Sequence, residues 1–164
     1  LGVHIHYIEQ EPKEIATGYA LYLAKNFLSD TSFLMLYGDV LIEINLKDFI
    51  AYHSQSSSIA TLALTSIKDP SPYGVAGLRG GKIVEFVEKP KEKEELSRVI
   101  SAGLFCFEPK IFDELSSEKD LALEKDVFPK LAKEGKLAGY LFEGKWFDIG
   151  TPEIYARAIK DWGK

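Results

Sequence analysis

Two aspartates in this sequence each follow an apolar run and lie near a glycine. Asp39 follows Gly38 at the end of the run 33–37, and Asp148 lies in Trp146-Phe147-Asp148-Ile149-Gly150. The carboxyl ends of strands form the edge at which open α/β sheets bind ligands, and a glycine lets a ligand approach the backbone. Two carboxylates at such an edge would suit Mg²⁺, which prefers oxygen ligands and keeps waters for substrate phosphates. The alternative for each aspartate is a cap of the following turn.

A second group of polar residues flanks a predicted hairpin. The segments 75–78 and 83–87 are apolar and are joined by Arg79-Gly80-Gly81-Lys82, which predicts two strands and a glycine turn. Tyr73-Gly74 precedes this hairpin and Glu88-Lys89-Pro90 ends it. A lysine ammonium can bind phosphate, and a glutamate can accept hydrogen bonds from hydroxyls. The alternatives are an exposed ion-paired segment at Glu88-Lys89 and a plain turn at Tyr73-Gly74.

Other reactive residue types have structural interpretations. His4 and His6 would lie on one face of a strand, but no third ligand follows at a suitable spacing, so a partly covered sheet face is preferred to a metal site. Cys106 lies between two phenylalanines and is predicted to be in the core. As the only cysteine it excludes an internal disulfide and a cysteine-based zinc cluster. It also favours a reducing compartment, which we take to be the cytoplasm.

The composition narrows the range of partners. A chain of 164 residues fits one domain, and its 46% hydrophobic and 27% charged residues are near the averages for globular proteins. The net charge is −5, whereas nucleic-acid-binding proteins usually carry an excess of positive charge. No apolar run approaches the roughly 18 residues that span a bilayer. We therefore expect neither nucleic acid nor membrane among the partners.

Strand-like and helix-like segments alternate, which predicts a single α/β domain over residues 1–164 with a mixed sheet and an inserted hairpin. Besides the hairpin, strands are expected at 3–9, 33–37, 59–67, 99–107, 137–142 and 146–149. The run 33–37 is expected to be buried on both faces. Helices are expected at 13–29, 46–55, 109–116 and 122–134, and after Thr151-Pro152-Glu153. Asn45 is the expected N-cap of the helix 46–55.

Five segments, in this order, resemble the sugar-1-phosphate nucleotidyltransferases, enzymes similar to glucose-1-phosphate thymidylyltransferase and mannose-1-phosphate guanylyltransferase. The segments are Tyr37-Gly38-Asp39, Tyr73-Gly74-Val75, the hairpin end Glu88-Lys89-Pro90, Ser101-Ala102-Gly103-Leu104-Phe105, and the stretch from Trp146 to Tyr155. Their order extends over nearly the whole chain. The resemblance implies a Rossmann-like, mixed and mostly parallel sheet with flanking helices and the inserted hairpin.

The resemblance also implies an activity, with roles for individual residues. An oxygen of a hexose-1-phosphate would attack the α-phosphate of a nucleoside triphosphate and release pyrophosphate. Asp39, Asp148 and Lys89 would be the catalytic residues, with Mg²⁺ on the two aspartates and the sugar phosphate on Lys89. The substrate site would also contain Gln10, Gly38, Tyr73, Gly74, Glu88 and Ser101, with Gln10 on the nucleobase and Glu88 on sugar hydroxyls.

Three departures from the family pattern lead to further expectations. The segment Tyr7-Ile8-Glu9-Gln10, followed by Ile15-Ala16, resembles the family's base-recognition loop. Glu14 lies at or beside a position where this loop usually has glycine. Ser101 replaces the asparagine that is usual in the sugar pocket. The glycine-rich Thr-Arg signature does not occur, so we expect an N-terminally incomplete sequence, about the C-terminal two thirds of the catalytic domain. Such a chain would be inactive alone, and its unpaired strand edges would favour a homo-oligomer. The alternative is a non-catalytic sugar-phosphate-binding or regulatory subunit. A metal-dependent glycosyltransferase is disfavoured, because Asp39-Val40-Leu41 lacks paired acids.

Overall fold

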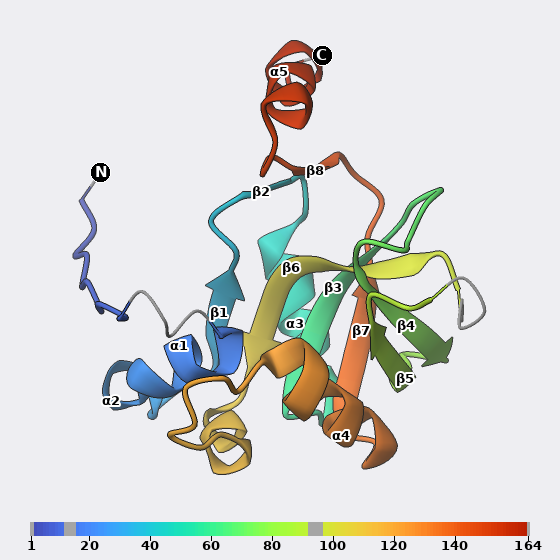
Figure 1. Cartoon of the computed structure of the whole chain (residues 1–164). Coiled ribbons are helices and arrows are strands. Elements are labelled where there is room, and N and C mark those ends of the chain that lie inside the picture. Colours follow the sequence, from blue (N-terminus) through green and yellow to red (C-terminus); the bar gives the residue numbers. More distant parts are fainter. Residues whose placement is uncertain (1, 12–15, 92–96, 164) are drawn as a thin grey trace.

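Two sheets carry the fold in residues 2–11, 16–91 and 97–163, which the computed structural model describes. The larger sheet has six strands in the order β1-β6-β3-β7-β5-β4, and the smaller sheet pairs β2 with β8 (Figure 1). The larger sheet consists of β1 (Phe33–Leu36), β3 (Ala60–Ser66), β4 (Gly74–Arg79), β5 (Lys82–Glu88), β6 (Val99–Phe107) and β7 (Leu137–Leu141). The smaller one consists of β2 (Val40–Ile42) and β8 (Trp146–Asp148). Most of the predicted strands are therefore present, and β2 is an addition.

The larger sheet is mixed, as the sequence predicts. Strand β6 lies between β1 and β3 and is antiparallel to both, so β1 and β3 run in the same direction. Strand β7 pairs with β3 in parallel. The β4–β5 hairpin adds to the far side of the sheet through an antiparallel pairing of β5 with β7. Strands β1, β3 and β7 thus run in the same direction, and β3 pairs with β7 in parallel. Strand β6 and the hairpin contribute antiparallel pairs.

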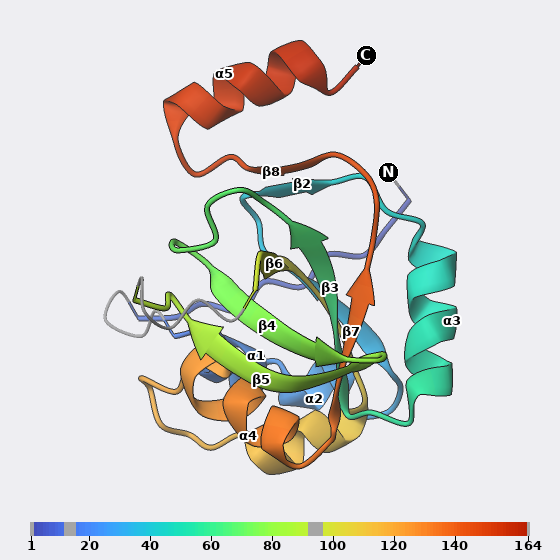
Figure 2. The ribbon, with the colours of Figure 1, turned by 90° about the vertical axis from the view of Figure 1, so that its right-hand side faces the viewer.

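Helices cover both faces of the larger sheet (Figures 1 and 2). Helix α3 (Leu46–Ser56) begins at Asn45, whose side chain accepts hydrogen bonds from two backbone amides of the first turn, as predicted. It packs against β3 and β7 on one face. The other face carries α1 (Thr17–Leu23), α2 (Lys25–Leu28) and α4 (Phe128–Lys133), with a π-helical turn (Leu123–Val127) before α4. No helix of the described residues has the length and apolar character needed to cross a bilayer.

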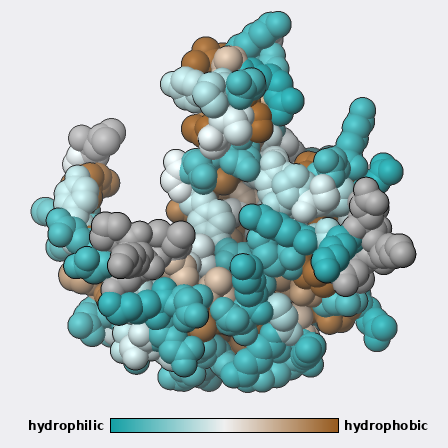
Figure 3. Space-filling view, viewed as in Figure 1, coloured by the Kyte–Doolittle hydropathy of each residue, from teal (hydrophilic) through white to brown (hydrophobic). Residues whose placement is uncertain are grey.

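The last helix, α5 (Pro152–Asp161), extends from the smaller sheet and lies away from the main body (Figures 1 and 2). The Thr151 side chain caps it by accepting from the backbone N–H of Ile154, as the Thr-Pro-Glu sequence predicts. Hydrophobic side chains gather on its surface (Figure 3). The Tyr155 and Ile159 side chains of α5 are 51% and 65% exposed.

Several predicted elements differ from the structure. The segment Val3–Glu9 is not a strand, and its apolar side chains are exposed because no strand pairs with it within the described residues. The run 33–37 forms β1 but is not buried on both faces. Leu34 and Leu36 are 38% and 51% exposed, because α3 covers this face over β3 and β7 and leaves the edge strand β1 open. The segment 109–116 is a 3₁₀-helix (Pro109–Glu114), and residues 13–15 of the helix predicted at 13–29 lie outside the described residues.

Strand β6 of the larger sheet contains a bulge, which lies next to β2 of the smaller sheet. Leu62 of β3 pairs with Phe105, whereas Leu64 pairs with Ser101, so β6 has two more residues than β3 between these pairs. Gly103 lies in the extra stretch with φ of +75°. This left-handed conformation is costly for a residue with a Cβ. The bulge therefore requires glycine at this position.

The side chains packed around Gly103 also leave little room for a Cβ at this position. A Cβ on Gly103 would lie 3.0 Å from Val40 Cγ2 and 3.1 Å from Tyr37 Cδ2. The carbonyl of Gly103 accepts a hydrogen bond from the backbone N–H of Tyr37 at 2.9 Å. The neighbouring carbonyl of Ala102 accepts one from Trp146 Nε1 at 3.0 Å. The bulge thus connects the end of β1, β2 and β8.

We expect Gly103→Ala to lower the free energy of unfolding by about 2–4 kcal/mol, because backbone strain and overpacking combine. Gly135→Ala is the matched control: Gly135 has φ of +69°, but no atom lies within 4 Å of its Cβ position. The free energy of unfolding of the control should fall by only about 1–2 kcal/mol, the cost of a side chain at positive φ. Urea unfolding of both variants measures the difference, and equal losses would show that Val40 and Tyr37 do not constrain Gly103.

Candidate active site

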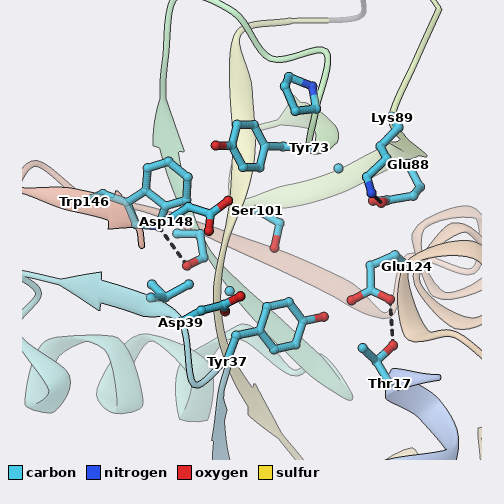
Figure 4. A pocket seen from close by; sticks show the side chains of 15 residues that line it. Thr17, Tyr37, Asp39, Tyr73, Glu88, Lys89, Ser101, Glu124, Trp146 and Asp148 are labelled. Carbon is cyan, nitrogen blue, oxygen red and sulfur yellow. Dashed lines mark hydrogen bonds and ion pairs between the residues drawn. The ribbon is translucent and has the colours of Figure 1, made fainter. Parts of the chain in front are cut away.

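A cavity of about 350 Å³ opens where the two sheets and the hairpin meet (Figure 4). Seven of the nine predicted site residues line it: Asp39, Tyr73, Gly74, Glu88, Lys89, Ser101 and Asp148. They come from the loop after β1, from both ends of the hairpin, from β6 and from β8. Residues far apart in the sequence therefore share one cavity.

Asp39 and Asp148 lie side by side because the smaller sheet joins their segments. Asp148 pairs with Val40 across β2 and β8, and the backbone N–H of Ile149 donates to the carbonyl of Asp39 at 2.8 Å. The Cβ position of Gly150 lies 3.2 Å from Asp148 Oδ1 and 3.8 Å from Asp39 Oδ2. The two carboxylates therefore face the same small space.

The donor set at this space fits Mg²⁺. Within the described residues, no group of three or more His, Cys, Asp or Glu side chains could hold a metal ion. Two carboxylates alone are a poor site for Zn²⁺, which takes three or four protein ligands. They suit Mg²⁺, which is commonly held by one or two carboxylates together with waters and substrate phosphates.

Glu88 is packed tightly at the base of the hairpin. It pairs with Gly74 across β4 and β5, and a Cβ on Gly74 would collide with the Phe86 ring and lie 2.9 Å from Glu88 Oε2. The Glu88 side chain is only 17% exposed. Burial raises the pKa of Glu88, and the opposing effects of Lys89 and Lys125 are smaller. The carboxylate is thus held in place at an electrostatic cost.

Lys89 takes an unusual backbone conformation at the rim of the cavity. Its φ is +47°, which is rare for a residue with a side chain. Its backbone N–H donates to the carbonyl of Tyr73 at 3.1 Å. The side chain is 68% exposed and its ammonium lies 3.9 Å from Glu88 Oε1. The turn therefore places a cation at the cavity without burying it.

The cavity wall also contains four side chains with polar atoms that the sequence does not mark as site residues: Thr17, Tyr37, Glu124 and Trp146. Thr17 Oγ1 donates to Glu124 Oε2 at 2.7 Å and accepts from the backbone N–H of Leu123 at 3.0 Å. Glu124 lies in a charged stretch that looks like a solvated helix face, so no local pattern identifies it. Only the packing of α1 against the π-helical turn places these residues in the cavity wall.

The remaining predicted residues are less directly placed. Gln10 lies in the exposed N-terminal segment and does not line the cavity. Gly38 lies between two lining residues, and no atom is within 4 Å of its Cβ position. Glu14 and Ile15 of the predicted base loop lie outside the described residues. Cys106 is buried as predicted, and burial raises the pKa of its thiol to about 11, so it is no nucleophile at neutral pH.

The comparison with protein families decides the classification. A family model described as "Nucleotidyl transferase" matches residues 1–164. The chain belongs to the nucleotidyl transferase family. Its relatives include the probable mannose-1-phosphate guanylyltransferase 3 of Arabidopsis thaliana, 35% identical over 151 residues, which are 89% of this chain and 45% of that protein. The mannose-1-phosphate guanylyltransferase catalytic subunit beta of Dictyostelium discoideum is 33% identical over 158 residues, 94% of this chain and 43% of that protein.

Two solved structures share the fold of this chain. A putative glucose-1-phosphate thymidylyltransferase from Bacillus anthracis, in complex with a sucrose, has a TM-score of 0.77 and 26% identity, covering 87% of this chain and 59% of that one. HddC from Yersinia pseudotuberculosis, complexed with GMP-PN, has a TM-score of 0.73 and 25% identity, covering 95% and 65%. The chain spans less than half the length of the two relatives compared above.

The raised pKa of Glu88 predicts a pH-dependent stability for this nucleotidyl transferase. A carboxyl whose pKa is raised by folding favours the folded state below its unfolded pKa, and this contribution is lost as the pH rises through the folded pKa. We therefore expect Glu88→Gln to unfold at higher urea concentration than the parent at about pH 8. The difference should disappear near pH 3, where Glu88 is protonated in both states.

Glu85→Gln is the matched control, since Glu85 lies on the same strand with an exposed side chain. It should change stability little at either pH. A Glu88→Gln variant that is less stable than the parent at pH 8 would show that the ionised carboxylate is favourable in the folded protein.

Proposed function

We propose that this nucleotidyl transferase transfers a nucleotidyl group from a nucleoside triphosphate to a hexose-1-phosphate. A nucleotide sugar and pyrophosphate would be the products. The observation that carries the proposal is the pair Asp39 and Asp148, whose carboxylates face one space beside a cavity that also holds Glu88 and Lys89. The relatives named as mannose-1-phosphate guanylyltransferases support the same class of reaction.

The physical difficulty of this reaction is that two anions must meet. The phosphate oxygen of the sugar-1-phosphate attacks the α-phosphorus as the bond to pyrophosphate breaks, so negative charge concentrates in a small volume. Catalysis then depends on charge neutralisation and alignment. Mg²⁺ held by Asp39 and Asp148 would supply Lewis-acid stabilisation when bound. Lys89 would neutralise the sugar phosphate, with the backbone at Gly74 beside it.

The other predicted residues would orient the substrates. Glu88 would accept hydrogen bonds from sugar hydroxyls, and Tyr73 and Ser101 would form the nearby wall. Gln10 on the nucleobase and Gly38 in the substrate site stay predictions, as do a cytoplasmic location and a homo-oligomer.

The acidic pair also bears on the alternative of a non-catalytic sugar-phosphate-binding subunit. Two carboxylates beside a phosphate site repel the phosphate unless a cation lies between them. A module that only bound the sugar phosphate would gain nothing from this pair, whereas a metal-dependent transferase requires it. The geometry therefore favours the enzyme.

The test of the proposal is pyrophosphate release by the intact protein, with each nucleoside triphosphate and a set of hexose-1-phosphates in the presence of Mg²⁺. Asp148→Asn, which is nearly isosteric, should lower kcat by at least about 100-fold, because even outer residues of metal sites are worth 10- to 100-fold. Asp113→Asn, an exposed aspartate outside the cavity, is the control and should keep full activity. Pyrophosphate release from no pair of substrates, or full activity of Asp148→Asn, would overturn the proposal.

Lys89 should show a conflict between binding and stability. Lys89→Ala and Lys89→Gly both remove the ammonium, so both should weaken hexose-1-phosphate binding by roughly 10- to 100-fold. Lys89→Gly should be more stable than Lys89→Ala by about 1 kcal/mol, because glycine relieves the positive φ. Calorimetric titration and urea unfolding measure the two effects.

Ser57 provides the backbone control for this comparison, since its φ is +52° and it ends α3 away from the cavity. Ser57→Gly and Ser57→Ala should reproduce the stability difference without any effect on binding. Unchanged affinity in both Lys89 variants would mean that the lysine is only a surface charge.

A further inference from the structure

The hydroxyl of Tyr37 has no role in the proposed chemistry and no partner in the protein. Its oxygen is buried and makes no hydrogen bond, and it is the only such side-chain atom in the part of the chain that the structure describes. Buried polar groups are nearly always hydrogen-bonded, because losing water without compensation is costly. Tyr37 also lines the candidate active site. An unpaired donor in a cavity wall indicates a ligand group as its partner.

The surrounding packing holds the Tyr37 ring in one orientation. Its backbone N–H is bonded to the carbonyl of Gly103, and Gly103 has no Cβ, which would lie 3.1 Å from the ring. The ring of Phe105 packs edge-on against it, with centroids 5.2 Å apart. Between these contacts the phenol projects toward the side of the cavity where Thr17 and Glu124 lie (Figure 4). The hydroxyl therefore faces the Thr17 and Glu124 side of the cavity from a closely packed ring.

The charges nearby decide what kind of group the Tyr37 hydroxyl would meet. Glu124 is a carboxylate in the same wall, and Thr17 already donates its proton to one of its oxygens. A second anion such as a phosphate would be repelled there. A sugar hydroxyl fits, because it can accept a hydrogen bond from one neighbour and donate one to another. Glu124 offers the acceptor and Tyr37 the donor.

We propose that the Tyr37 hydroxyl donates a hydrogen bond to a hydroxyl of the hexose in bound hexose-1-phosphate, and that Tyr37 thereby contributes to sugar specificity. This inference rests on the proposed function and adds a residue that reads the sugar rather than the phosphate. Glu124 accepts a hydrogen bond from the same part of the sugar.

The experiment compares Tyr37→Phe with the parent in the intact protein, by calorimetric titration with a hexose-1-phosphate and, separately, with the nucleoside triphosphate. We expect the dissociation constant of the sugar phosphate to rise about 2- to 13-fold, the range for one neutral hydrogen bond. Binding of the triphosphate should not change. The urea midpoint should stay the same or rise, since the variant removes an unpaired buried hydroxyl.

A series of deoxyhexose-1-phosphates tests the contact itself. The parent should bind one deoxy analogue more weakly than the complete sugar by a similar factor, and Tyr37→Phe should not distinguish that analogue from the complete sugar. This loss of discrimination is a result that a merely structural role of Tyr37 does not produce.

Tyr52→Phe is the matched control. The Tyr52 hydroxyl lies 3.0 Å from the carbonyl oxygens of both Gly81 and Gly139, and Tyr52 does not line this cavity. Its loss should lower stability and leave sugar-phosphate binding unchanged, which is the opposite pattern.

The contrary outcomes are distinct. If the parent binds hexose-1-phosphate and Tyr37→Phe binds it equally well, the inference alone is overturned. Weaker triphosphate binding in place of weaker sugar binding overturns it too, because the hydroxyl then reads the nucleotide. A parent that binds no hexose-1-phosphate overturns the proposed function, and the inference falls with it.

Discussion

The bulge of β6 is the constraint on which the site depends. Two consecutive carbonyls in it, those of Ala102 and Gly103, bind the side chain of Trp146 and the backbone of Tyr37. The two acidic residues follow at equal distances along the chain, since Asp39 is two residues after Tyr37 and Asp148 two residues after Trp146. The bulge in β6 thus positions the segments that carry both carboxylates. In a regular β6, consecutive carbonyls would point to opposite sides and bond to the two neighbouring strands, β1 and β3.

The cavity is acidic, so its protein groups alone are poorly suited to binding a phosphate. Asp39, Asp148, Glu88 and Glu124 line it, while Lys89 is its only lysine or arginine among the described residues. Burial already disfavours the ionised form of Glu88. Such a site favours cations and hydroxyls over anions until a metal ion is bound. Burial disfavours the ionised form of Glu88, and Lys89 has a positive φ, so both residues cost stability at the candidate site.

The parts of this site that sequence reasoning found are those with a local signal. Asp39 and Asp148 follow apolar runs beside glycines, and Glu88-Lys89 ends a hairpin that its glycine turn predicts. Asn45 and Thr151 were identified as helix caps for the same reason. Each of these features is determined by neighbours within a few residues.

The errors and omissions have the opposite origin. Alternation of apolar residues predicts a strand at Val3–Glu9, but a strand exists only with a hydrogen-bonded partner, and none is present in the described residues. Burial of Leu34 and Leu36 depends on what covers an edge strand, which composition does not show. Tyr37 and Glu124 enter the cavity only through packing between distant segments. Local pattern contains no information about any of these.

Lys89 is exposed, so its position depends on how firmly the β4–β5 hairpin is held. Contacts at the far end of the hairpin hold it. There, the Lys82 ammonium binds the carbonyl of Ser56 and the hydroxyl of Ser58, at 2.9 and 2.6 Å. These contacts attach the β4–β5 turn to the end of α3 and leave the opposite end of β5 at the cavity. Because electrostatic stabilisation is strongest when charges need no rearrangement, a hairpin anchored at one end is an effective support for the proposed phosphate contact of Lys89 at the other.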